Sequence, residues 1–255
     1  MGGDPANIEN HQLTEQHDPI VQTCNRFLGR ATDSVVLDVT SLPKRFFFPL
    51  LRMLFRSDRD TIKNLVVTYA VPERYTKEHL AENFGDWTQL PLFAGKYTHK
   101  HSETLVVGVG FEALGLQDRL ETSESGRRIH FLLPFPAPAA AFQRSWELLW
   151  RLQQHQRSDV PRVHRVDVKD IADAFDRIVS LTDSGTKSVD LAPFGPKPIS
   201  VAMCVYAALT DSEVFYTQPT VYHPDYSTGV SVRDGHPEIY AYCLRLDGRD
   251  LFAIA

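Results

Sequence analysis

Two turns in the chain place a lysine directly after a proline, between a short apolar run and a helical pattern. One reads Thr-Ser-Leu-Pro-Lys-Arg over residues 40–45, and the other reads Phe-Gly-Pro-Lys-Pro over residues 194–198. A helix N-terminus presents free N–H groups and a partial positive charge, so a lysine there favours an anion such as phosphate. We therefore predict ligand contacts from residues in and just after these turns, namely Thr40, Ser41, Lys44, Arg45, Gly195, Lys197 and Ser200.

Two further strand ends carry residues suited to the same site. Gly108 and Gly110 lie at the end of an apolar run over residues 103–109, and Gln218 and Tyr222 follow residues 213–217. Because ligands bind beyond the carboxyl ends of parallel strands, we expect these residues near one pocket, where aromatic faces can stack on a base. The alternative is that all of them belong to ordinary caps and turns, in which serine, threonine, glycine and proline are common.

Established catalytic and metal-binding motifs are absent from the sequence. There is no GxxxxGK[ST] loop, no GxGxxG at a strand–helix turn, no GxSxG elbow and no HExxH pair. The cysteines Cys24, Cys204 and Cys243 are widely spaced, which predicts buried thiols without zinc, in a reducing and hence cytoplasmic compartment. We predict neither a metal nor a cofactor. Asp38, inside a strand, could be catalytic, although an unpaired buried carboxylate is costly.

The composition is that of an ordinary soluble protein. The chain has 255 residues, 43% of them hydrophobic, and a formal net charge of −5. That charge argues against an extended nucleic-acid surface, and no apolar run approaches the ~20 residues that span a bilayer, so we expect no membrane contact. Residues 1–17 form a polar arm that is not a signal peptide. Because Met1 opens directly into Gly-Gly-Asp-Pro, an upstream first strand could be missing.

Short β-branched runs alternate with amphipathic runs along most of the chain. Strands are expected at 34–39, 64–70, 103–109, 128–133, 162–168, 187–192 and 213–217, and helices at 19–28, 42–55, 111–120, 139–154, 168–181 and 198–209. The alternation predicts an α/β fold in one domain over 1–255. We expect a single doubly wound, mostly parallel, Rossmann-like sheet with at least five parallel strands and helices on both faces. Residues 238–246 and 251–254 predict a C-terminal hairpin across Asp247-Gly248, and Pro49 predicts a kink or restart of its helix.

Two segments resemble parts of a known family. They are Leu-Asp-Val-Thr-Ser-Leu-Pro-Lys-Arg after an early strand, and a Gly-Pro-Lys turn before the small-residue helix Ile-Ser-Val-Ala-Met-Cys-Val-Tyr-Ala-Ala-Leu. With the Rossmann-like layout, they resemble the CRISPR-associated Rossmann-fold and SAVED-type ligand-sensing domains of prokaryotic defence. The resemblance implies a pocket for cyclic or linear oligonucleotide signals, in which Thr40 and Ser41 match a strand-end element and Gly195, Lys197 and Ser200 match a Gly-x-Lys turn. Since no effector domain is evident, it also implies an output through a partner chain.

Three functions follow from these patterns. The first is a binding module for a nucleotide or phosphate-bearing ligand, as a sensor or subunit of a defence complex with a protein partner or a second copy. The second is a hydrolase or transferase acting on a nucleotide or sugar phosphate, using Asp38, Glu112 or Asp225 with Lys197. The third is a scaffold whose aromatic surface docks a partner through Phe46, Phe47, Phe48, Trp87, Trp146 and Trp150.

Overall fold

The computed structural model describes residues 8–75, 81–94, 102–110, 116, 127–136, 139–155, 162–223 and 227–254. Its largest parallel element is a four-stranded sheet with the strand order β7-β6-β5-β8. The strands are β5 (Thr104–Gly108), β6 (Arg128–Phe135), β7 (Arg162–Asp167) and β8 (Val189–Pro193). Both β5 and β8 are buried along their whole length, as expected for strands of a parallel sheet that is covered on both faces.

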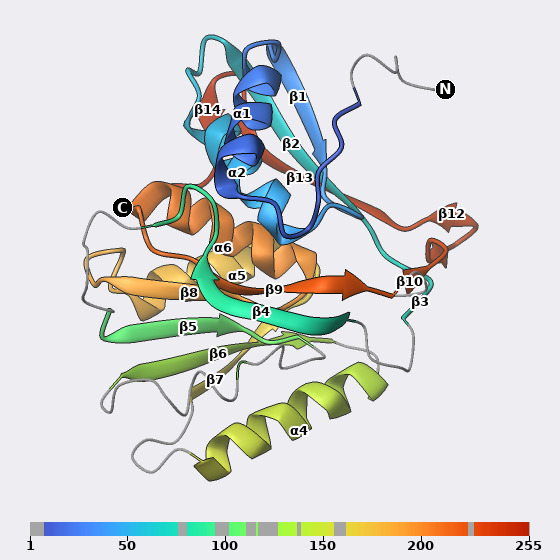
Figure 1. Cartoon of the computed structure of the whole chain (residues 1–255), viewed down its shortest axis with the longest axis vertical. Coiled ribbons are helices and arrows are strands. Elements are labelled where there is room, and N and C mark those ends of the chain that lie inside the picture. Colours follow the sequence, from blue (N-terminus) through green and yellow to red (C-terminus); the bar gives the residue numbers. More distant parts are fainter. Residues whose placement is uncertain are drawn as a thin grey trace.

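Helices cover this sheet. α5 (Ile171–Leu181) and α6 (Lys197–Thr210) pack against each other, and α4 (Ala139–His155) lies on the far side of the strands from them (Figure 1). A 3.1 Å hydrogen bond from Ser145 Oγ to the Gly110 carbonyl joins α4 to the segment after β5. In α6, every residue from Pro198 to Ala208 is buried. A helix that is apolar on all sides belongs in the interior, and α6 lies there.

A second sheet is built from strands that lie far apart in the sequence. β1 (Asp33–Asp38) pairs in parallel with β2 (Ile62–Ala70), and β2 pairs antiparallel with β13 (Ile239–Leu246). α1 (His17–Leu28) and α2 (Lys44–Arg56) accompany this sheet, and α2 packs against α6 in the region between the two sheets (Figure 1).

The α/β class and the parallel sheet are thus confirmed, but the prediction of one doubly wound sheet needs correction. Within the described ranges the strands form separate sheets, and the largest parallel one has four strands. The physical reason is that a strand pattern identifies a strand without identifying its neighbour. The pattern predicted strands near β1 and β2, but only the fold shows that β13, from the end of the chain, pairs with β2 in their sheet.

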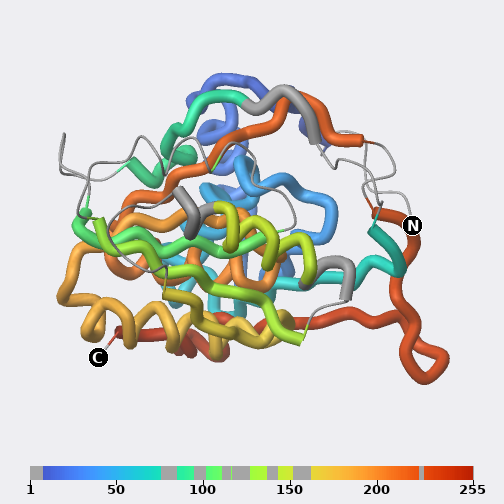
Figure 2. The backbone as a smooth tube through the Cα atoms, turned by 90° about the horizontal axis from the view of Figure 1, so that it is seen from below, coloured from blue at the N-terminus to red at the C-terminus, as the bar shows by residue number. Residues whose placement is uncertain are grey.

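β4 (Ala81–Gln89) and β9 (Phe215–Tyr222) form an antiparallel pair beside the four-stranded sheet. Val214, just before β9, makes a parallel bridge with Leu191 of β8, so β9 starts at the edge of that sheet. The remaining short pairs are β3 (Arg74–Tyr75) with β10 (Ser227–Thr228), and β11 (Val232–Arg233) with β12 (His236–Pro237). The β11–β12 hairpin projects from the body of the molecule (Figure 2).

The predicted C-terminal turn is confirmed between β13 and β14 (Arg249–Asp250), with Asp247 and Gly248 both at positive φ. The second strand of the hairpin begins earlier and is shorter than the sequence suggested. Pro49 lies inside α2, which continues through it as one helix without a restart. No helix in the described part of the chain is long and apolar enough to cross a membrane.

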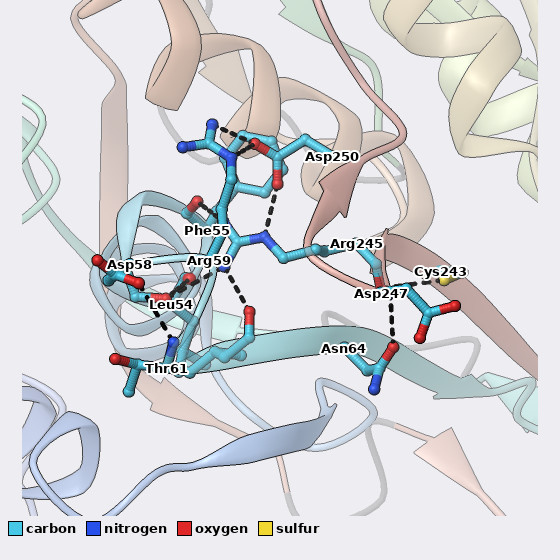
Figure 3. Close-up of polar contacts among 12 residues, drawn as sticks. Leu54, Phe55, Asp58, Arg59, Thr61, Asn64, Cys243, Arg245, Asp247 and Asp250 are labelled. Carbon is cyan, nitrogen blue, oxygen red and sulfur yellow. Dashed lines mark hydrogen bonds and ion pairs between the residues drawn. The ribbon is translucent and has the colours of Figure 1, made fainter.

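Arg245 is the largest fully buried side chain among the described residues, and it ties the hairpin of β13 and β14, which belongs to the second sheet, to the end of α2 and the start of β2. Its Nε donates to Asp250 Oδ1 at 2.6 Å and its Nη1 donates to the Ile62 carbonyl at 3.0 Å, while Nη2 donates to the Phe55 carbonyl (Figure 3). Because a buried guanidinium is tolerated only with an ion pair and satisfied N–H groups, these bonds fix the end of α2, the start of β2 and the hairpin together.

Candidate functional site

The two proline–lysine turns begin two helices that pack against each other. α2 starts at Lys44 after the N-cap residue Pro43, and α6 starts at Lys197 after the N-cap residue Pro196. Neither cap makes a side-chain hydrogen bond, and neither first turn contains an acidic residue. The first N–H groups of a helix have no partner within the helix, so both starts keep their partial positive charge uncompensated by a side chain.

Lys197 is half-buried and reaches across to the turn before α2. Its Nζ donates to the Leu42 carbonyl and lies 5.0 Å from the centre of the Phe47 ring. Burial lowers the pKa of Lys197 well below its usual value, and the positive charge of Lys44 lowers it further, while the charge of Asp38 opposes the shift. The two lysines therefore lie close enough for one charge to act on the other.

Lys44 is also half-buried, and its Nζ lies 5.3 Å from the centre of the Tyr216 ring. Burial lowers the pKa of Lys44 to about 8. An ammonium over an aromatic face is attracted by the ring, but that attraction replaces only part of the hydration that burial removes.

The other lysines that the structure describes are paired with carboxylates. They form ion pairs between Lys63 and Asp33 at 3.4 Å, between Lys169 and Glu238, and between Lys187 and Asp183. In this part of the chain, Lys44 and Lys197 have no carboxylate oxygen within the 4.0 Å of an ion pair. Asp38 Oδ1 instead accepts hydrogen bonds from Thr40 N at 2.9 Å and Thr40 Oγ1 at 2.5 Å. Among the described residues, the lysine pair is thus a cationic site without a carboxylate partner.

Several other predicted site residues position these turns. Thr40 Oγ1 also accepts from Ala70 N at 2.9 Å, so it ties the ends of β1 and β2 together. Ser41 beside it is exposed. Arg45 is buried and donates to the Glu15 carbonyl in the N-terminal segment. Thr40 and Arg45 therefore have structural partners within the chain.

The predicted glycines allow the end of β5 to cross the turn before α6. A Cβ on Gly110 would lie 2.1 Å from the Phe194 carbonyl oxygen, and one on Gly195 would lie 3.2 Å from the Gly108 carbonyl carbon. Ser200 is buried, its Oγ donates to the Pro196 carbonyl at 3.1 Å, and its N–H bonds the same carbonyl. Close backbone packing around the turn therefore positions Lys197, and it involves Gly108, Gly110, Gly195 and Ser200. The N–H of Ser200 is already hydrogen-bonded to the Pro196 carbonyl.

Gln218 and Tyr222 lie in β9 with Tyr216, whose ring is the one near Lys44. Burial raises the pKa of Tyr222, and hydrogen bonds from Tyr216 and Gln218 oppose that shift. Gln218 is 9% exposed; its Nε2 donates to the Pro219 carbonyl at 2.8 Å, and its Oε1 accepts no hydrogen bond from the described residues. These side chains connect to Lys44 through the ring of Tyr216, which sequence reasoning missed. The sequence feature that could have identified Tyr216 is its position near the end of the strand expected at 213–217, which the structure shows as β9 (Phe215–Tyr222).

The residues of the two alternative functions are dispersed. Glu112 and Asp225 lie outside the described residues, and Asp38 is held by Thr40. Of the predicted aromatic surface, Phe47 and Phe48 are fully buried. Phe46 is half-buried, Trp87 stacks at 5.7 Å on both Phe194 and Phe215, and Trp146 and Trp150 are exposed on α4.

No group of three or more potential metal ligands occurs in the described ranges. The arrangement is suited to holding an anion: two cations, two helix starts and an adjacent aromatic, carboxamide-bearing wall. Comparison with protein-family models and with curated proteins finds no match to this chain.

Proposed function

We propose that this chain is a binding module for a nucleotide or another phosphate-bearing ligand, and that Lys44 and Lys197 hold its anionic group. The observation that carries the proposal is the missing counter-charge. The two lysines are the first residues of two adjacent helices, and neither has a carboxylate within ion-pair distance in the described part of the chain. Two neighbouring, half-buried ammonium groups are costly unless an anion joins them.

A phosphate supplies the missing charge. Its oxygens accept charge-assisted hydrogen bonds from both ammonium groups, and the helix starts add N–H donors and favourable dipoles. Tyr216 lies beside Lys44, and Tyr222 contacts Tyr216 and Gln218 in turn. Their aromatic faces and the carboxamide suit the base of a nucleotide. The proposal therefore assigns the phosphate to the lysines and the remainder of the ligand to β9.

The sequence resemblance suggests a biological role for such a binding module. If the ligand is an oligonucleotide signal, as in the ligand-sensing domains of prokaryotic defence, the chain is the sensor and a partner chain or second copy carries the output. The resemblance supports this setting, and it rests on the two proline–lysine turns.

A thermal-shift screen tests the proposal. A ligand that binds the folded state alone raises its stability, so inorganic pyrophosphate, mononucleotides, dinucleotides and cyclic nucleotides are compared. For the best probe, Lys197→Ala should weaken binding by about 1–3 kcal/mol, roughly 5- to 150-fold, the range for losing a charge-assisted hydrogen bond. Lys187→Ala is the matched control, because Lys187 pairs with Asp183. A screen without any stabilising phosphate, or equal losses in both variants, refutes the proposal.

A further inference from the structure

Lys44 differs from the other described lysines in what surrounds its amine. Lys63, Lys169 and Lys187 each pair with a carboxylate, and the Nζ of Lys197 donates to the Leu42 carbonyl. Lys44 has the face of Tyr216 at 5.3 Å, and no hydrogen bond or ion pair joins its Nζ to another described residue. Its nitrogen is therefore not committed to an acceptor among the residues that the structure describes.

The surroundings of Lys44 favour its neutral form, because burial removes water from the amine. Lys197 on α6 supplies a neighbouring amine, and the carboxylate of Asp38 at the end of β1 acts on Lys197 and accepts hydrogen bonds from Thr40. Tyr216 on β9 supplies an aromatic face. An amine attacks a carbonyl only when it is neutral, and desolvation beside another cation is a known way to activate a lysine.

The size of this effect follows from the pKa of Lys44, which burial lowers to about 8. At pH 7 roughly a tenth of this amine is neutral, against roughly 0.04% for a lysine with the ordinary pKa of about 10.4. A less basic amine is also a weaker nucleophile. We therefore expect Lys44 to react about tenfold faster or more than an ordinary lysine, which is less than the ratio of the two neutral fractions.

We propose that Lys44 is a reactive amine that forms an imine with the aldehyde group of a phosphate-bearing ligand. The proposal rests on the proposed function, because the phosphate held at Lys197 brings the aldehyde to Lys44. The neutral amine adds to the carbonyl carbon, and the carbonyl oxygen takes up a proton to give a carbinolamine. Loss of that hydroxyl with a proton, as one water molecule, forms the C=N bond. The sequence involves no oxidation or reduction and needs no further reactant.

The probe is pyridoxal 5′-phosphate, which carries both an aldehyde and a phosphate, and the imine is trapped with cyanoborohydride. Peptide mass mapping then follows modification at each lysine of the wild-type chain over time. Lys63 and Lys187 are internal controls with exposed side chains and carboxylate partners. We expect Lys44 to be modified at least about ten times faster than either control, and pyrophosphate to protect it. Pyridoxal, which lacks the phosphate, should modify it more slowly.

Modification of Lys44 at the rate of the two controls, faster modification of Lys197, or equal rates with pyridoxal and its phosphate would each overturn the proposal. Lys44→Arg provides a second test, since it keeps the charge and removes the reactive amine. This variant should remain folded, as measured by circular dichroism, while losing the fast phase of labelling at residue 44. If Lys44 is unreactive and pyrophosphate still binds, this inference fails and the proposed function stands. If pyrophosphate does not bind the wild-type chain, the proposed function fails.

Discussion

Replacing Lys44 with methionine should stabilise the ligand-free protein, although it removes a residue of the binding site. The pKa of Lys44 falls to about 8, compared with about 10.4 in an unfolded chain. At about 1.36 kcal/mol for each pKa unit, a fully buried charge would cost about 3 kcal/mol. Lys44 is only half-buried, so solvent screening reduces this cost to roughly half, and the attraction to Tyr216 returns about 0.5–1 kcal/mol. Lys44→Met should therefore raise the free energy of unfolding by about 1 kcal/mol.

The assay is urea denaturation at neutral pH, with Lys63→Met as the control. Lys63 is 54% exposed and lies 3.4 Å from Asp33, so its substitution should change stability by less than about 0.5 kcal/mol. A Lys44→Met protein that is clearly less stable than wild type would refute the reasoning. That result would mean that the ammonium is already satisfied by the protein, and the site would then lack the missing counter-charge on which the proposed function rests.

The same variant has a pH signature. Between pH about 8 and about 10.4 the folded state binds fewer protons at Lys44 than the unfolded chain does, so wild-type stability should gain from rising pH through this window. Lys44→Met removes that gain, although the part due to Lys197 remains. Unfolding measured across this range should therefore show a shallower pH dependence in the variant. Identical slopes in the two proteins would contradict the burial of a charged Lys44.

Three further predictions concern the scaffold. Arg245→Met should lower the free energy of unfolding by about 3–5 kcal/mol in urea, because it leaves Asp250 Oδ1 and two buried carbonyls without the guanidinium that donates to them. Arg59→Met, which removes only the exposed donor to Asp250 Oδ2, should cost less than about 1 kcal/mol. Burial lowers the pKa of His130 to about 4, so between pH ~6.5 and about 4 the unfolded chain binds more protons than the folded state, and stability falls as the pH drops through this range. Thermal melts recorded across this range should show a smaller loss of stability for His130→Gln. Gly110→Ala should lower the melting temperature strongly, because its Cβ would meet the Phe194 carbonyl at 2.1 Å, whereas Gly29→Ala, with its nearest atom at 3.4 Å, should not.

Local patterns predicted the elements better than their arrangement. The terminal turn at Asp247-Gly248 could be predicted because the required positive φ values restrict which residues serve there. Most expected strands and helices are present within a few residues. The second sheet could not be predicted, because β1, β2 and β13 carry ordinary strand patterns and nothing in their sequences specifies their pairing. Arg245, which joins the hairpin of this sheet to α2 and the start of β2, looks like any surface arginine in the sequence.

In the candidate site, too, the local turns could be predicted from the sequence, but the contacts between distant segments could not. The proline–lysine turns were visible in the sequence, and the structure brings Lys44 and Lys197 into one cluster. The roles of the residues around them depend on contacts between distant segments. Thr40 bonds Asp38 and Ala70, and Ser200 bonds its own turn, so hydroxyls that suited a ligand from sequence alone are used within the protein.

Calorimetric titration of pyrophosphate into the wild-type chain and into the double variant Lys44→Met/Lys197→Met tests the central claim most directly. We expect saturable binding to the wild type that weakens as salt concentration rises, because screening reduces the attraction between exposed charges. The double variant, which should remain folded because both side chains are replaced by apolar ones of similar length, should show no measurable binding. Equal affinity in the two proteins, or no binding to the wild type at low salt, would contradict the anion site.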